Sequence, residues 1–151
     1  MRFAIDSNIL VYAVSREDGR KHEIAVEIMV RAPKLDCVLP VQVIGEFLNV
    51  IRRRNSLGFD AALVQASRWA ATMAIAETGA QHVLAAAGFA KRYKLQLWDS
   101  VIWQVASSAG AGFFISEDLQ DGLTLEGMTV IDPFDSSNEA PLRALLQTAE
   151  G

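Results

Sequence analysis

Short apolar runs alternate with longer segments of helical periodicity, and this alternation is the feature that most constrains the fold. The apolar runs cover residues 2–5, 37–39, 112–116 and 128–131, and the last is followed by Pro133. Such runs between polar, Gly or Pro residues are typical of buried strands. Strands that alternate with helices form mostly parallel sheets with helices on both faces. We therefore predict an α/β fold with a mostly parallel central sheet.

Helical segments separate these runs. In several stretches apolar residues recur three and four positions apart, which is the spacing of one helix face. Pro40 begins one such helix, at a position where its missing N–H costs nothing, and Gly110 and Gly112 end another. Residues 95–97 are predicted to be briefly extended. The predicted helices are about residues 7–13, 19–30, 40–51, 59–76, 81–93 and 98–110, with a short C-terminal helix over 141–148.

The length and composition of the chain fit one domain. Its 151 residues are 51% apolar, which is enough to close a single buried core. We expect residues 1–134 to form this domain and residues 135–151 to be a helical tail. The single Cys37 lies in an apolar run, where a buried and inert thiol is expected. With no signal-peptide core and no run of about 18 apolar residues, we expect a soluble protein of the reducing cytoplasm, without a membrane partner.

The net charge at first argues against a nucleic-acid ligand. The chain has 14 Lys and Arg against 18 Asp and Glu, a net charge of −4, whereas nucleic acids are bound through their phosphates by cations. Four of these acids are candidates for one site, and without them 14 acids face 14 bases. The rest of the protein is then close to neutral, so local patches matter more than net charge.

Four carboxylates lie in segments that a parallel α/β sheet would bring together at its ligand-binding edge. Asp6 follows the first apolar run, Glu46 lies inside a helix, Asp99 opens another helix, and Asp118 lies just past the run 112–116. Ligands of open α/β sheets bind beyond the carboxyl ends of the strands. Asp6 and Asp99 have the ordinary alternative of helix capping, and Glu46 that of a solvated polar stripe. The joint occurrence of all four favours a shared site.

A shared site of four carboxylates predicts a divalent cation. Two unit charges about 4 Å apart repel by roughly 4 kcal/mol at an effective dielectric constant near 20, and a bound cation removes this cost. Oxygen ligands without His or Cys favour Mg²⁺ or Mn²⁺ over zinc, and such sites hydrolyse phosphodiesters. His22 and His82 lack metal-like spacing, so we expect ordinary polar roles for both.

Four segments resemble the PIN domain of VapC-type toxins, in the order and at the spacing of that family. They are residues 4–13 (AIDSNILVYA), 42–47 (QVIGEF), 98–100 (WDS) and 116–122 (SEDLQDG), the last followed by VIDPF at 130–134. The resemblance covers about residues 2–134. Two departures are Ser116, where Thr is common in the family, and the chain that continues past residue 134.

The resemblance implies a PIN-like three-layer α/β/α fold and a Mg²⁺-dependent endoribonuclease, with Mn²⁺ as a possible substitute. Such proteins are commonly the toxin of a type II toxin–antitoxin pair and act on structured RNA such as tRNA or rRNA. The implied partners are RNA, a cognate antitoxin and a second copy of the chain, with the apolar helices within 59–90 as its contact surface. The residues that would be catalytic and hold the metal are Asp6, Glu46, Asp99 and Asp118, oriented through hydrogen bonds by Asn8 and Ser116.

Two other classes of protein remain as alternatives. An aspartyl-phosphate phosphatase would use Asp6 as nucleophile, but it would want a second Asp at the position of Asn8. A catalytically inactive PIN-like module would bind RNA or a partner without cutting, although it has little physical reason to keep four carboxylates that repel one another. Within the closing motif, Asp118 competes with Glu117 and Asp121. Its place in the motif favours Asp118, which leaves Asp121 as a lesser ligand or a turn former.

Two further groups of residues have an ordinary structural interpretation. Arg52, Arg53 and Arg54 form a basic run at a helix C-terminus, where the helix dipole favours cations, so we expect solvated side chains rather than phosphate contacts. The three tryptophans could stack on RNA bases, but each lies in an apolar helical pattern, so we expect core positions. They are Trp69, Trp98 and Trp103.

Overall fold

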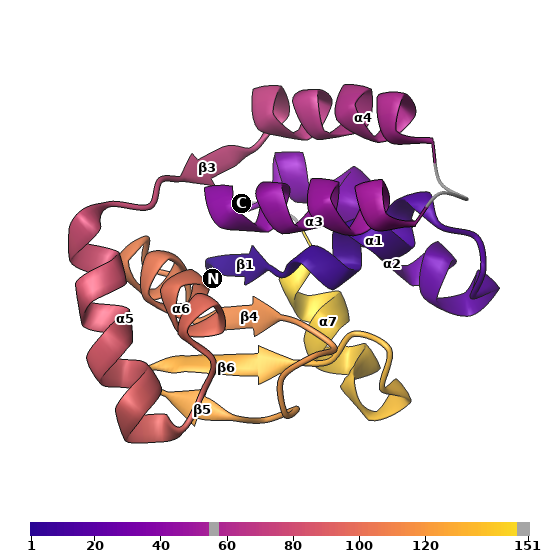
Figure 1. Cartoon of the computed structure of the whole chain (residues 1–151). Coiled ribbons are helices and arrows are strands. Elements are labelled where there is room, and N and C mark those ends of the chain that lie inside the picture. The colour runs from indigo at the N-terminus through magenta and orange to yellow at the C-terminus, as the bar shows by residue number, and fades with distance from the viewer. Residues whose placement is uncertain (55–57, 148–151) are drawn as a thin grey trace.

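A six-stranded sheet forms the centre of the structure, a computed structural model that describes residues 1–54 and 58–147. Its spatial strand order is β3-β2-β1-β4-β6-β5, and all neighbouring strands are parallel except β5 and β6 (Figure 1). The prediction of a mostly parallel sheet is confirmed. The strands are β1 (Phe3–Ile5), β2 (Cys37–Pro40), β3 (Ala74–Ala76), β4 (Phe113–Ile115), β5 (Thr124–Leu125) and β6 (Met128–Ile131).

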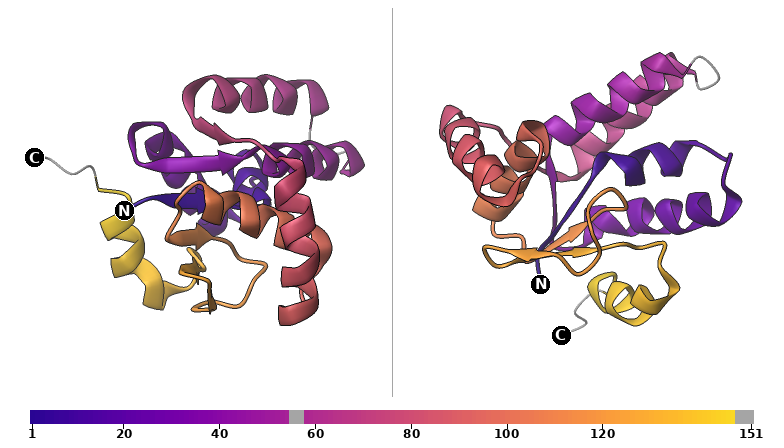
Figure 2. Two further views of the ribbon diagram at one scale, coloured as in Figure 1. Left: turned by 90° about the vertical axis from the view of Figure 1, so that its left-hand side faces the viewer. Right: turned by 60° about the horizontal axis from the view of Figure 1, so that its bottom comes forward.

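Helices cover both faces of the sheet, which gives the three-layer α/β/α arrangement that was expected. Helices α5 and α6 lie on one side, and α1, α2 and α7 lie on the other (Figure 2). Among the described residues, no helix is long and apolar enough to cross a membrane. The helices are α1 (Ser7–Val14), α2 (Gly19–Arg31), α3 (Val41–Arg53), α4 (Phe59–Thr72), α5 (Ala80–Tyr93), α6 (Leu97–Ser108) and α7 (Glu139–Leu145), with 3-10 turns at Ala32–Lys34 and Ser136–Asn138.

Three elements differ from the sequence-based prediction. Residues 74–76 were predicted to be helical but form β3, because they pair in parallel with Val38, Leu39 and Pro40 of β2. Pairing with a distant strand thus overrides the local preference of an Ala-rich segment. Pro40 belongs to β2, and the helix begins one residue later. Residues 95–97 form no strand, since Leu97 already starts α6. The two-residue β5 was not predicted.

The C-terminal helix packs on the body of the protein. It spans Glu139–Leu145 rather than 141–148, and Thr148 lies outside the described residues. Leu142 and Leu146 are buried and join the main core cluster. The guanidinium of Arg20 on α2 also donates a hydrogen bond to the carbonyl of Phe134, just before this helix. The sequence analysis predicts only a helical tail here, and these contacts place the tail against the body of the protein.

The three tryptophans do not share one environment. Trp69 and Trp103 are buried, as predicted, and the Trp103 ring lies 5.9 Å from the ring of Phe114 between centroids. Trp98 was predicted to be in the core, but 55% of its surface is exposed. It lies in the first turn of α6 beside the exposed Leu97, and the buried residues of this helix begin only at Ser100. The apolar periodicity of α6 therefore extends one turn beyond its buried part.

Replacing Trp103 with Ala is expected to lower the free energy of unfolding by about 3–5 kcal/mol, because a large, fully buried side chain is lost and a cavity remains. Replacing the exposed Trp98 with Ala is expected to change it by only about 0.5 kcal/mol. Urea denaturation of both variants provides the measurement. Equal losses for the two variants would contradict this assignment of buried and exposed positions.

Candidate functional site

The four candidate carboxylates come from elements that meet at one edge of the sheet. Asp6 directly follows β1, and Asp118 lies three residues after the end of β4. Glu46 lies in α3, which begins directly after β2, and Asp99 lies in the first turn of α6. Strands β2, β1 and β4 are neighbours and parallel, so their carboxyl ends lie side by side. We call these four residues the acid group.

Asp6 caps a helix and also contacts the other residues of the site. Its Oδ1 accepts a hydrogen bond of 2.8 Å from the backbone N–H of Ser7, which caps α1. Its Oδ2 accepts one of 2.6 Å from the hydroxyl of Ser116. The residue as a whole is only 7% exposed. The sequence analysis treated helix capping and membership of the site as alternatives for Asp6. In the structure the same side chain does both.

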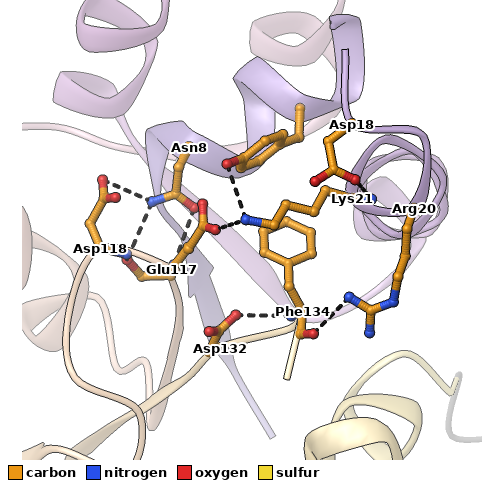
Figure 3. A network of polar contacts seen from close by, with 10 residues as sticks. Asn8, Asp18, Arg20, Lys21, Glu117, Asp118, Asp132 and Phe134 are labelled. Atoms are coloured by element: carbon orange, nitrogen blue, oxygen red, sulfur yellow. Dashed lines mark hydrogen bonds and ion pairs between the residues drawn. The ribbon is translucent and has the colours of Figure 1, made fainter. Parts of the chain in front are cut away.

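Asn8 and Ser116 connect Asp6 with the loop that follows β4. The side-chain nitrogen Nδ2 of Asn8 lies 3.2 Å from Asp6 Oδ2 and 3.2 Å from Asp118 Oδ2. Its oxygen Oδ1 accepts a hydrogen bond from the backbone N–H of Glu117 (Figure 3). The hydroxyl oxygen of Ser116 accepts one from the backbone N–H of Asp118. These contacts hold the loop and both carboxylates in one arrangement.

Ser7 orients Glu46, and the sequence did not single it out. Its hydroxyl donates a hydrogen bond of 3.0 Å to Glu46 Oε2, which joins α1 to α3. Ser7 is buried, and Glu46 is half-buried. The only sign of this role in the sequence was the place of Ser7 between the polar residues Asp6 and Asn8. Its partner Glu46 lies 39 positions away along the chain.

Burial and neighbouring carboxylates raise the pKa values of three members of the acid group, Asp6, Glu46 and Asp99. Burial is the main reason that the pKa of Asp6 rises to about 7, and the charges of Glu46 and Asp118 add to the shift against the lowering effect of its hydrogen bonds. The pKa of Glu46 is raised by burial and then by Asp99 and Asp118. The pKa of Asp99 is raised by burial and then by Asp118. All four carboxylates are thus close enough to interact.

The donor chemistry of the acid group fits a hard divalent cation. Its side chains offer only carboxylate oxygens, together with the hydroxyl and amide oxygens of their neighbours. In the part of the chain that the structure describes, no three His, Cys, Asp or Glu side chains form a group that could hold a metal ion as they stand. Mg²⁺ usually keeps several waters and binds only one or two carboxylates directly, so these residues fit such an ion through direct and water-mediated contacts.

An ion pair beside the acid group anchors the loop after β4. The ammonium of Lys21 on α2 contacts the carboxylate of Glu117 and lies 3.4 Å from the hydroxyl of Tyr12 (Figure 3). It also lies 5.1 Å from the ring centroid of Tyr12 and 5.4 Å from that of Phe134. Because Glu117 directly precedes Asp118, the pair restrains the loop that carries the fourth acid. Lys21 and Tyr12 were not identified from the sequence, since neither shares a motif with Glu117.

Replacing Lys21 with Met is expected to lower the free energy of unfolding by about 1–2 kcal/mol, because Glu117 keeps its charge in a half-buried place without its partner. The double variant with Glu117→Gln should recover part of this loss. A double-mutant cycle by urea denaturation measures the coupling, with Lys34→Met as the exposed control. A coupling energy within error of zero would show that the pair does not restrain the loop.

The remaining sequence candidates have structural roles. Asp121 Oδ1 accepts hydrogen bonds from the backbone N–H of Asp132 and from Asn138, as expected for the turn-forming alternative. His22 Nδ1 lies 2.8 Å from the carbonyl oxygen of Tyr12, and His82 accepts a hydrogen bond from the backbone of Gly79. The prediction of ordinary polar roles for both histidines is confirmed. Cys37 is buried as predicted, and burial raises the pKa of its thiol.

Comparison with protein families identifies one match, and comparison with curated proteins finds none. The family model described as PIN domain matches residues 3–120 of the chain. No curated protein matches. The matched range includes all of the acid group as well as Asn8 and Ser116.

Several solved structures share the fold. VapC20 from Mycobacterium tuberculosis, described as a sarcin–ricin loop cleaving toxin, has a TM-score of 0.64 at 18% identity over 77% of this chain and 89% of its own. PAE2754 from Pyrobaculum aerophilum has a TM-score of 0.63 at 17% identity, over 96% of this chain and 95% of its own. VapBC2 from Rickettsia felis, in a structure bound to a DNA fragment from its promoter, has a TM-score of 0.61 at 12% identity. The match covers 86% of this chain and 97% of the VapBC2 chain.

Proposed function

Because this chain belongs to the PIN-domain family, we propose that it is a metal-dependent endoribonuclease that hydrolyses RNA phosphodiester bonds. The observation that carries the proposal is the acid group, in which burial and neighbouring carboxylates raise the pKa values of Asp6, Glu46 and Asp99. Within residues 1–54 and 58–147, no Lys, Arg or His forms an ion pair with any of its four carboxylates. The group therefore has negative charge that is available for a cation.

The proposed roles follow from the contacts of each residue. The acid group would hold Mg²⁺ or Mn²⁺, which when bound stabilises the charge that develops on phosphoryl oxygens and activates water. Ser116 and Asn8 keep the Asp6 carboxylate in one orientation, and Ser7 does the same for Glu46. The burial of Asp6 excludes bulk water from one side of the site.

Cleavage of a mixed pool of tRNA and rRNA by the purified protein tests the proposal. With Mg²⁺ or Mn²⁺ we expect fragments, which disappear with EDTA and in the variant Asp99→Asn. If metal binding is detectable by calorimetry but no RNA is cut, the alternative of a PIN-like binding module is favoured. An absence of metal binding would reject the assignment of the acid group as a metal site.

We also propose that the protein is the toxin of a type II toxin–antitoxin pair in the cytoplasm. The fold shared with VapC20 and with the VapBC2 complex supports an antitoxin partner. We expect this partner to block the acid group. Co-purification with the product of the neighbouring gene tests this, and a stable, non-toxic protein without such a partner would contradict it.

A homodimer is the expected assembly of the toxin. Large apolar side chains are exposed on α4 and α5 within the segment 59–90, and Leu84 is 75% exposed. Apolar surface of this kind is common where copies of a chain associate. Light scattering is expected to show a dimer, and a monomer at high concentration would reject this assembly.

A further inference from the structure

A pocket of about 180 Å³ lies beside the acid group, and we call it the α1–α3 pocket. Helix α1 lines it with side chains that include Asn8, Val11 and Tyr12, and Val50 lies on the α3 side. Its acidic side is formed by Glu117 and Asp118, which follow β4 (Figure 3). The pocket therefore joins an apolar wall to one of the four candidate metal ligands.

Among the residues that the structure describes, Arg54 is the only cation that lines this pocket. Its backbone N–H donates to the carbonyls of Val50 and Ile51, which places the residue at the C-terminal end of α3. Among the described residues its guanidinium forms no ion pair and no side-chain hydrogen bond, whereas Lys21 nearby is already paired with Glu117. Arg54 thus offers its donors to a ligand next to Asp118.

A larger cavity of about 460 Å³ lies between α2 and α7, and the arginines that line it already have partners within the protein. Arg31 and Arg143 there form ion pairs with Glu27 and Glu139, and Arg20 donates to a backbone carbonyl. The charges of that cavity are therefore largely satisfied within the protein.

We propose that the α1–α3 pocket is a nucleotide subsite, in which Arg54 binds an RNA phosphate next to the one that is cut. This inference rests on the proposed function. An RNA strand presents anionic phosphates beside flat bases with apolar faces, and this pocket pairs a guanidinium with Val11, Val50 and Tyr12. The carboxylates of the acid group repel RNA phosphates. Because Arg54 is a cation beside this group, it favours a path of the RNA strand through the α1–α3 pocket.

The basic run of α3 supplies a matched control. Arg52, Arg53 and Arg54 are all exposed, but only Arg54 lines the pocket. Arg54→Gln, Arg54→Lys and Arg53→Gln are compared in binding a random-sequence pool of short single-stranded RNA by fluorescence anisotropy, over a series of salt concentrations. Each is made in the Asp99→Asn background to keep bound RNA intact and also in the otherwise unchanged protein to measure cleavage.

Arg54→Gln is expected to weaken RNA binding about tenfold and to reduce the salt dependence of log K by about 0.7, the value for one phosphate contact on a single strand. In cleavage, KM should rise while kcat changes less than about twofold. Arg54→Lys should keep the salt dependence, and Arg53→Gln should leave binding unchanged. Because the Arg54 side chain is exposed, thermal unfolding should be unaffected, which separates lost binding from lost folding.

Equal affinity and salt dependence of Arg54→Gln and Arg53→Gln would overturn the subsite. If the unchanged protein still cuts RNA in that case, the proposed nuclease function stands and only the subsite fails. If the unchanged protein neither binds nor cuts RNA, the proposed function fails, and the subsite fails with it. If it binds RNA without cutting, the binding comparison alone decides for or against the subsite.

Discussion

Replacing Asp6 with Asn is expected to reduce RNA cleavage by about a hundredfold or more and at the same time to stabilise the metal-free protein at alkaline pH. The loss of activity follows if Asp6 is a metal ligand, because even outer contacts of metal sites contribute about 10- to 100-fold. The gain in stability follows from burial, which raises the pKa of Asp6 from 3.8 to about 7. The two effects together distinguish a site residue from an ordinary helix cap.

The sign of the pH dependence follows from this pKa difference. Between pH 3.8 and about 7 the unfolded chain loses the Asp6 proton while the folded protein keeps it, so stability falls as pH rises. Above pH 7 the full shift costs about 4 kcal/mol. Asn has no charge to bury and still accepts the hydrogen bond from the Ser7 N–H that caps α1.

Urea denaturation in EDTA measures this effect. Relative to the unchanged protein, the free energy of unfolding of Asp6→Asn should increase by about 2–3 kcal/mol more at pH 8 than at pH 5. Asp60→Asn, which changes an exposed carboxylate in the first turn of α4, is the control and should show little pH dependence. The compared quantity is the free energy of unfolding of Asp6→Asn minus that of the unchanged protein. If this difference is smaller at pH 8 than at pH 5, the burial of a charged Asp6 is contradicted.

Binding of Mg²⁺ or Mn²⁺ is expected to stabilise the protein by about 3 kcal/mol at a concentration a hundred times the dissociation constant, and removal by EDTA should reverse this. The affinity should be roughly tenfold or more lower at pH 5.5 than at pH 7.5. The reason is that protons compete with the ion for Asp6, whose pKa is about 7, and for Glu46 and Asp99, whose pKa values are also raised.

Calorimetry at pH 6 in two buffers of different ionisation enthalpy tests the competition directly. Binding of one ion should release close to one proton, because Asp6 is mostly protonated at that pH in the metal-free protein. Asp60→Asn should release as many protons as the unchanged protein. Equal affinity at both pH values without proton release would mean that the ion binds away from Asp6.

Much of the fold could be predicted because its signals are local. The apolar runs at 2–5 and 128–131 became β1 and β6, and the helical spacing over 19–30 became α2. Strand and helix periodicity reflect which side chains face the core, and this repeats within a few residues. Parallel pairing then follows from the alternation of these elements. The carboxyl ends of β1 and β4, and with them the positions of Asp6 and Asp118, could be located in the same way.

The errors arose where a distant residue decides the outcome. Residues 74–76 became a strand because they pair with β2, and Trp98 is exposed because the buried part of α6 begins only at Ser100. The packing of the tail on the body was not an error but was left undecided by the sequence, because it depends on Leu142 and Leu146 joining the core cluster. None of these partners lies within the window over which periodicity is visible.

The sequence by itself determined the order of strands and helices and the kinds of residue at the edge of the sheet, because apolar periodicity and turn residues act over a few positions. Only the tertiary structure decided how these residues interact: the hydrogen bond from Ser7 to Glu46, the pair of Lys21 with Glu117, the raised pKa of Asp6 and the place of Arg54 in a pocket. Burial and charge interactions depend on groups that are close in space but far apart along the chain.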